Sequence, residues 1–234
     1  MQVVWANISY FRLLFLIVSL FASHLSMAQE LTVVSNYRDY QKLAAKDSLQ
    51  RMADVRQQIP SIQIDLHYAT KENFTRKKLY PNGNQTFLRV AVLNALQKVA
   101  AELALQGYGI KIWDAYRPYS VTKKMWDLIG DERYVANPAK GSGHNRGLAI
   151  DLTLMQGSME VNMGTPFDHF SDTAHHGFKG LPEEVLKNRQ LLRSTMEKFG
   201  FRALETEWWH YSWPNDRQYD VLDISFKKLK KDIK

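Results

Sequence analysis

The chain has 234 residues, of which 45% are hydrophobic and 24% are charged, so it can form one domain with a substantial core or at most two small domains. It contains no cysteine, which excludes disulfides, cysteine nucleophiles and thiolate metal sites, so that any metal must be held by His, Asp or Glu. The net charge of +7 favours anionic surfaces such as a bacterial wall, whereas scattered basic residues and the lack of a recognised motif predict no nucleic-acid partner.

The first thirty residues have the composition of a targeting segment. A ten-residue, largely apolar run at positions 13–22 follows Arg12, and the small residues Ser26 and Ala28 precede Gln29. The apolar run is shorter than the roughly 20 residues that a membrane-spanning helix needs. We therefore predict a signal peptide over residues 1–28, which exports the protein to the periplasm or the extracellular space and leaves no stable membrane anchor after cleavage. An uncleaved membrane anchor is the alternative.

The remaining residues, 29–234, are predicted to form a single α+β domain with a mostly antiparallel sheet, because strands and helices mix without a regular βαβ rhythm. The polar residues 36–58 favour a helical N-terminal extension. The residues from position 226 onward are rich in lysine and are predicted to form a basic surface tail. Apolar spacing predicts helices at 87–105, 119–129 and 183–199. Alternation or aromatic content predicts strands at 62–68, 110–113, 147–154 and 201–213.

One candidate site lies in the segment "SGHNRGLAID" at residues 142–151. His144 and Asp151 would be roughly 23 Å apart on an extended strand at about 3.3 Å per residue, too far for two ligands of one metal. The chain must double back between them, and we predict a turn at Gly147. Asp151 projects from an otherwise apolar strand, where an unpaired carboxylate is costly.

The second candidate segment is "EWWH" at residues 207–210. On a regular strand Glu207 and His210 would face opposite ways, so we predict that the strand begins or bulges near Trp208. The tryptophans would form a dry wall, which raises the pKa of a carboxylate toward values useful for a general base. A lone strand histidine is more often structural and a buried aspartate more often meets an arginine, but together these residues fit a three-ligand metal site with an open fourth position.

Five motifs in the same order resemble the zinc D-alanyl-D-alanine dipeptidases of the vancomycin-resistance type, which are grouped with D-alanyl-D-alanine carboxypeptidases and the zinc domain of hedgehog proteins. Between residues 62 and 213 these are "IDLHYATKENFT", "WDAYRP", "SGHNRGLAIDLTL", "MGTPFD" and "EWWHY". Arg76 departs from the glycine that often follows "NFT", and the stretch between Leu154 and Met163 is short, so the shape of these loops is open.

The resemblance implies a small antiparallel sheet flanked by helices and one Zn²⁺ bound by His144, Asp151 and His210. It implies Glu207 as catalytic base and Arg117 as the group that stabilises the transition state. Asp168 and Ser142 match positions near the substrate's termini. The implied reaction is hydrolysis of the D-alanyl-D-alanine dipeptide, with a wall-trimming carboxypeptidase or endopeptidase, or a non-catalytic zinc-binding module, as alternatives.

Two other features leave questions open. Ser120 and Lys123 fit the "SxxK" pattern of penicillin-binding enzymes, but the partner motifs "SDN" and "KTG" are absent from the sequence. His175 and His176 could form a helix cap, support the site or have no role. The oligomeric state and the exact dipeptide preference do not follow from the sequence.

Overall fold

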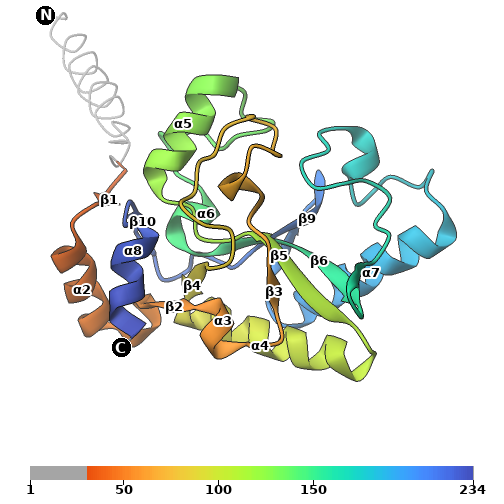
Figure 1. Ribbon diagram of the computed structural model, residues 1–234, viewed down its shortest axis with the longest axis horizontal. Coiled ribbons are helices and arrows are strands. Elements are labelled where there is room, and N and C mark those ends of the chain that lie inside the picture. Colours follow the sequence, from red (N-terminus) through yellow and green to blue (C-terminus); the bar gives the residue numbers. More distant parts are fainter. Residues whose placement is uncertain (1–30, 234) are drawn as a thin grey trace, which may run out of the picture. The chain divides into compact units, whose positions relative to one another are not determined.

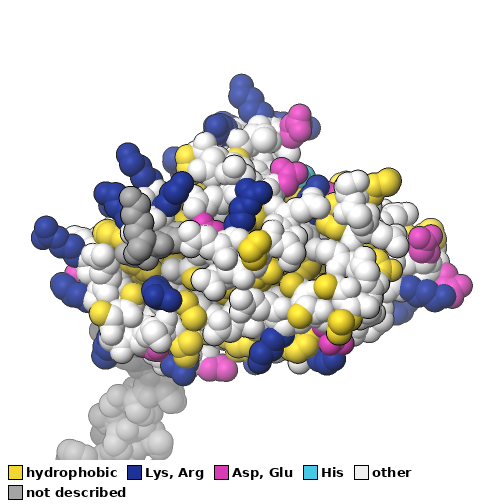
Figure 2. Space-filling model, turned by 60° about the horizontal axis from the view of Figure 1, so that its bottom comes forward, with side chains coloured by type: hydrophobic (Ala, Val, Ile, Leu, Met, Phe, Trp, Pro, Cys, Tyr) yellow, Lys and Arg dark blue, Asp and Glu magenta, His cyan; other side chains and the backbone are white. Residues whose placement is uncertain are grey.

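The computed structural model describes residues 31–233, so the apolar run at 13–22 and the predicted cleavage site lie outside the described residues. None of the helices in the described range is both long and apolar enough to cross a bilayer. Figure 2 shows Lys and Arg side chains spread across the visible face rather than gathered over one element.

A six-stranded sheet forms the centre of the domain, in the order β3-β5-β6-β9-β8 with β7 paired to β6. Only the β3–β5 pair is parallel within this sheet, which confirms the predicted α+β class with a mostly antiparallel sheet. The strands are β3 (Gln63–Ile64), β5 (Gly109–Asp114), β6 (Ala149–Gln156), β7 (Met159–Glu160), β8 (Arg202–Leu204) and β9 (Glu207–Ser212).

Two 16-residue helices, α4 (Val90–Leu105) and α7 (Glu183–Lys198), contact the sheet and each other. Apolar residues recur every three or four positions in α4, and the buried ones include Val92, Leu96 and Val99. In Figure 1, α4 lies below the sheet and α5 (Tyr119–Ile129) above it. The predicted helix at 119–129 is therefore confirmed with both of its ends.

The strand β6 is buried over seven of its eight residues, so both of its faces are covered. Alternation in the sequence predicted one apolar and one more polar face. On the second face Asp151 is 3% exposed and Thr153 is 1% exposed. Part of that face is covered by the segment after β7, in which Phe167 stacks on Trp113 of β5. Asp151 is therefore a buried carboxylate, which must have partners of its own.

Some predicted elements were wrong in type or extent. Residues 87–89 begin the predicted helix but form β4 (Phe87–Arg89), which pairs with β2 (Met52–Asp54) from the predicted helical extension. The rest of that extension contains α2 (Tyr37–Lys46), the 3-10 turn η1 (Ser48–Gln50) and α3 (Val55–Gln58). A strand pair joins backbone groups far apart in sequence, which local periodicity does not report.

Two further predictions need correction. The predicted strand at 62–68 is only β3, after which the chain turns into the 3-10 turn η2 (His67–Ala69). The predicted basic surface tail exposes the lysines that the structure describes, but it is also anchored to the domain, because α8 (Phe226–Leu229) buries Phe226 and Leu229. Just before it, β10 (Val221–Leu222) pairs with β1 (Val33–Val34). The remaining elements are α6 (Gly143–Arg146) and the 3-10 turns η3 (Asp172–Ala174) and η4 (Lys230–Ile233).

Candidate metal centre and active site

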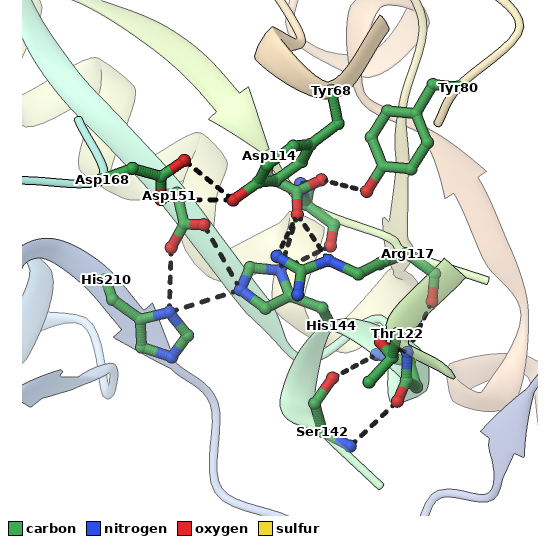
Figure 3. A network of polar contacts seen from close by, with 12 residues as sticks. Tyr68, Tyr80, Asp114, Arg117, Thr122, Ser142, His144, Asp151, Asp168 and His210 are labelled. Atoms are coloured by element: carbon green, nitrogen blue, oxygen red, sulfur yellow. Dashed lines mark hydrogen bonds and ion pairs between the residues drawn. The ribbon is translucent and has the colours of Figure 1, made fainter. Parts of the chain in front are cut away.

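Three side chains that could hold a metal ion meet at the junction of α6, β6 and β9 (Figure 3). His144, Asp151 and His210 each offer one ligand atom, and these atoms lie within 4.8 Å of one another. The His144 Nε2 atom is 3.3 Å from His210 Nδ1 and 3.4 Å from Asp151 Oδ2. His210 Nδ1 is 2.8 Å from the other oxygen of Asp151.

The turn that brings His144 back to Asp151 is the one-turn helix α6. Ser142 caps it, because its hydroxyl accepts a hydrogen bond from the Asn145 N–H at 3.1 Å and the Asn145 side chain accepts one from the Ser142 N–H at 3.0 Å. Gly147 ends the helix at φ +69°, and a Cβ there would lie 2.6 Å from the Met52 side chain. The predicted turn at Gly147 is confirmed, and its left-handed backbone favours glycine.

A bulge in β9 allows Glu207 and His210 to line the same cavity. Leu204 of β8 pairs with Glu207, but the next residue back, Ala203, pairs with Tyr211, so three residues of β9 lie between successive pairs. His210 pairs with Asp151 on the other side of the strand. The predicted irregularity near Trp208 is therefore confirmed. On a regular strand Glu207 and His210 would lie on opposite faces, and the bulge removes this restriction.

Hydrogen bonds around the cluster favour metal-binding forms of its side chains. The Ala115 carbonyl lies 2.7 Å from His144 Nδ1, and a proton on Nδ1 leaves the Nε2 lone pair facing the cluster. Burial raises the pKa of Asp151, but the nearby His144 and His210 outweigh burial and hold that pKa below its usual range. Asp151 is thus an ionised carboxylate beside two imidazoles.

The donor set fits zinc. Tetrahedral zinc with bonds of about 2.0–2.2 Å separates its ligand atoms by about 3.4 Å. The distances from His144 Nε2 to Asp151 and His210 match this separation, while the 2.8 Å contact between Asp151 and His210 is shorter. Two imidazoles and one carboxylate suit zinc rather than magnesium or calcium, which prefer oxygen ligands.

A cavity of 580 Å³ opens onto these three residues, and Glu207 and Arg117 also line it. Burial is the largest influence on the pKa of Glu207 and raises it. The nearby His210 lowers this pKa and the charge of Asp151 raises it, so that the net shift is upward. Trp209 lines the cavity, whereas Trp208 packs behind it against Trp113. One of the two predicted tryptophans therefore forms the dry wall next to the carboxylate.

Arg117 is held in place by a carboxylate that sequence analysis did not identify. Asp114, which has no exposed surface, accepts hydrogen bonds from Arg117 Nε at 3.0 Å and Nη2 at 2.6 Å, and from the Tyr80 hydroxyl at 2.6 Å. The Tyr68 ring lies 5.2 Å from the Arg117 guanidinium. The Arg117 side chain is 9% exposed, so its charge is fixed at the cavity wall.

Asp168 lies in the same cavity, at a strained backbone position with φ +58°. The Tyr68 hydroxyl donates to both of its carboxylate oxygens, at 3.0 and 3.2 Å. Burial, and next the charge of Asp151, raise the pKa of Asp168 well above its ordinary value. An approaching cation would favour the ionised form of this carboxylate.

Of the other residues considered in the sequence, Ser142 and His175 line the cavity, whereas Ser120 and His176 do not. Ser142 lines the cavity while capping α6. Ser120 does not line it and instead donates a hydrogen bond to Asp223 at 2.8 Å, so the serine-enzyme alternative gains no support. His175 lies at the cavity wall, whereas the half-buried His176 ring lies 6.2 Å from that of Tyr211.

Sequence analysis missed Asp114, Asn145, Tyr68 and Tyr80 as site residues, although three of them lie within the quoted motifs. Asn145 was detectable as the fourth residue of a capping box, but asparagine is not the usual residue there. Arg76 adopts φ +54°, a conformation that suits the glycine often found at that position.

Comparisons with known proteins agree with this geometry. A family model described as D-ala-D-ala dipeptidase, of the peptidase family M15, matches residues 48–230. The D-alanyl-D-alanine dipeptidase of Escherichia coli (strain K12) is 34% identical over 168 residues, covering 71% of this chain and 86% of that protein. The D-alanyl-D-alanine dipeptidase of Enterococcus faecalis is 35% identical over 173 residues, covering 64% and 85%.

Among solved structures, the vancomycin-resistance D,D-pentapeptidase VanY aligns with a TM-score of 0.38 and 18% identity, over 57% of this chain and 75% of VanY. The match of the family model and the identity to the relatives place this chain in a single class. It belongs to the D-Ala-D-Ala dipeptidase family of zinc metallopeptidases.

Proposed function

We propose that this protein is a zinc-dependent dipeptidase that hydrolyses D-alanyl-D-alanine to two molecules of D-alanine. The observation that carries the proposal is the cluster of His144, Asp151 and His210 on the wall of a cavity that Glu207 and Arg117 also line. The relatives named above are D-alanyl-D-alanine dipeptidases, which supports the same substrate here.

His144 Nε2, Asp151 and His210 Nδ1 would hold the zinc ion. Zinc lowers the pKa of bound water toward about 7 and polarises a carbonyl group. The Glu207 carboxylate accepts a proton from the attacking water and passes it to the leaving amine. Its raised pKa suits this exchange, because a base works best when its pKa is close to the working pH.

Arg117 offsets the negative charge that develops on the carbonyl oxygen during attack. Its guanidinium is already fixed by Asp114, so little reorganisation is needed when that charge appears. A binding module would require neither Arg117 nor Glu207 in the cavity. Their placement supports an enzyme over a non-catalytic zinc domain.

Asp168 would pair with the free ammonium group of the substrate, with the Tyr68 hydroxyl orienting the carboxylate. This pairing favours a dipeptide, because only a dipeptide carries its amine so close to the scissile bond. Ser142 would contact the opposite, carboxylate end of the substrate, because the proton of its hydroxyl is free to donate while the oxygen accepts from Asn145.

The test is a substrate panel on the purified mature chain, with and without a chelator. We expect cleavage of D-Ala-D-Ala, loss of activity with the chelator and recovery with Zn²⁺. Cleavage of a D-Ala-terminated pentapeptide but not of the dipeptide would show a carboxypeptidase instead. Activity that survives complete metal removal would contradict the zinc mechanism.

We also propose that the protein is exported and recovers D-alanyl-D-alanine or related dipeptides outside the inner membrane. The proposal rests on residues 1–28, whose composition is that of a signal peptide. Fractionation of cells followed by N-terminal sequencing tests it. A mature chain that begins at Gln29 in the exported fraction is expected, and an uncleaved cytoplasmic product would contradict it.

A further inference from the structure

The segment that carries Asp168 is long and has little secondary structure of its own. It runs from the end of β7 at Glu160 to the start of α7 at Glu183, with only the short turn η3 inside it. Asp168 has a positive φ within this segment, a conformation that costs free energy for any residue other than glycine. Such a conformation persists only where surrounding contacts hold the backbone in place.

A single buried side chain, Arg189 of α7, binds this segment on both sides of Asp168. Its Nε donates to the Met163 carbonyl at 2.7 Å, and its Nη1 donates to the Thr173 carbonyl at 2.9 Å and the His175 carbonyl at 3.3 Å. These acceptors lie on either side of Asp168 in the sequence. Arg189 is 4% exposed, so its hydrogen bonds replace water that the guanidinium has lost.

The same guanidinium also lies near the first residues of β9. Its Nη2 lies 3.4 Å from the Thr165 hydroxyl, which accepts a hydrogen bond from Trp208 Nε1 at 2.8 Å. The guanidinium also lies 5.7 Å from the centre of the Trp208 ring. Trp208 directly follows Glu207, so Arg189 connects the Asp168 segment to the bulged strand that carries the proposed base.

We propose that Arg189 is a positioning residue that fixes the Asp168 carboxylate for the ammonium group of the substrate. This inference rests on the proposed dipeptidase function. A guanidinium suits the role because its planar fork of five donors can bridge acceptors that point from different directions, whereas a lysine ammonium can satisfy only part of such a set. The expected consequence is a selective effect on ligands that carry a free amine.

The experiment compares wild type with Arg189→Lys, using D-Ala-D-Ala and propanoyl-D-alanine, a competitive ligand that lacks only the ammonium group. We expect the KM for D-Ala-D-Ala to rise about tenfold or more, since small displacements of a binding group are costly. The inhibition constant of propanoyl-D-alanine should stay within about twofold, because it makes no ammonium contact. A purely structural role would weaken both ligands alike.

Arg193→Lys is the matched control, because Arg193 lies one turn along α7 and binds Glu197 and Glu205 rather than the Asp168 segment. Its KM should match that of wild type. Thr165→Val removes the hydroxyl that joins Arg189 to Trp208 and keeps the side-chain shape. We expect the same selective rise in the KM for D-Ala-D-Ala, but a smaller one, and this variant decides the matter if Arg189→Lys does not fold.

An unchanged KM in Arg189→Lys, or an equal loss for both ligands, would overturn the inference. Failure of the proposed function has a different signature, because wild type itself would then not cleave D-Ala-D-Ala.

Discussion

Replacing Asn145 by alanine tests whether the capped turn of α6 organises the metal centre. The side chain has no exposed surface and makes three hydrogen bonds, with the Ser142 N–H at 3.0 Å, the Arg117 carbonyl at 2.9 Å and the Thr122 hydroxyl at 2.8 Å. At about 1 kcal/mol for each bond, Asn145→Ala should lower the free energy of unfolding by about 3 kcal/mol. For a domain of this size that corresponds to a fall in Tm of about 6–12 °C.

The same change should weaken zinc binding by about tenfold or more, because α6 carries His144 and outer contacts of this kind orient a ligand. Urea unfolding of the metal-free protein and zinc titration against a chromophoric chelator measure the two effects. Asn137→Ala is the matched control, since its side chain makes exposed hydrogen bonds to Glu132 and Ala139. A variant of Asn145 with wild-type stability and zinc affinity would refute the reasoning.

Three further predictions concern single side chains. Glu207→Gln should keep its zinc, but its kcat should fall by a factor of about 10²–10⁴. Glu205→Gln, at an exposed position, is the control and should stay active, and zinc analysis and kinetics on the same sample decide this. Arg117→Lys should lose about 10²–10³ in kcat with zinc content unchanged, because lysine cannot reproduce the fork held by Asp114; an active variant would contradict the assignment. Burial lowers the pKa of His176 from 6.5 to about 4, so the unfolded chain takes up a proton first as the pH falls, and stability should be lost between these values. Urea unfolding from pH 7 to pH 4 should show a shallower loss of stability for His176→Gln than for wild type, and parallel curves would contradict a lowered pKa of His176 in the folded protein.

Local patterns predicted the irregularities of the site better than they predicted the strand partners. The need to bring His144 near Asp151 required a turn at Gly147, and the need to bring Glu207 near His210 required a bulge near Trp208. Both follow from ligand geometry, which is strict enough to constrain the chain between the ligands.

Pairing between distant segments escaped prediction. The short strands β2 and β4 lie in segments that read as helical, and β1 pairs with a strand near the other end of the chain. Strand propensity depends on which partner covers the backbone and the side-chain face, so a two- or three-residue strand leaves little local signal.

The sequence by itself determined the chemistry of this protein. The absence of cysteine, the placement of histidines beside acids and the ordered motifs together indicate a zinc peptidase. Periodicity also located the main helices, because a 3.6-residue repeat records which side of a helix is buried.

Only the tertiary structure revealed what holds that chemistry in place. Asp114 fixes Arg117, Asn145 joins α6 to the start of α5, and Arg189 binds the backbone on both sides of Asp168. Arg189 reaches back 26 residues to Met163, and Tyr68 meets Asp168 across 100 residues. The physical reason is that a buried polar group must find its partners within about 3 Å in space, whereas the sequence records only the order of residues along the chain.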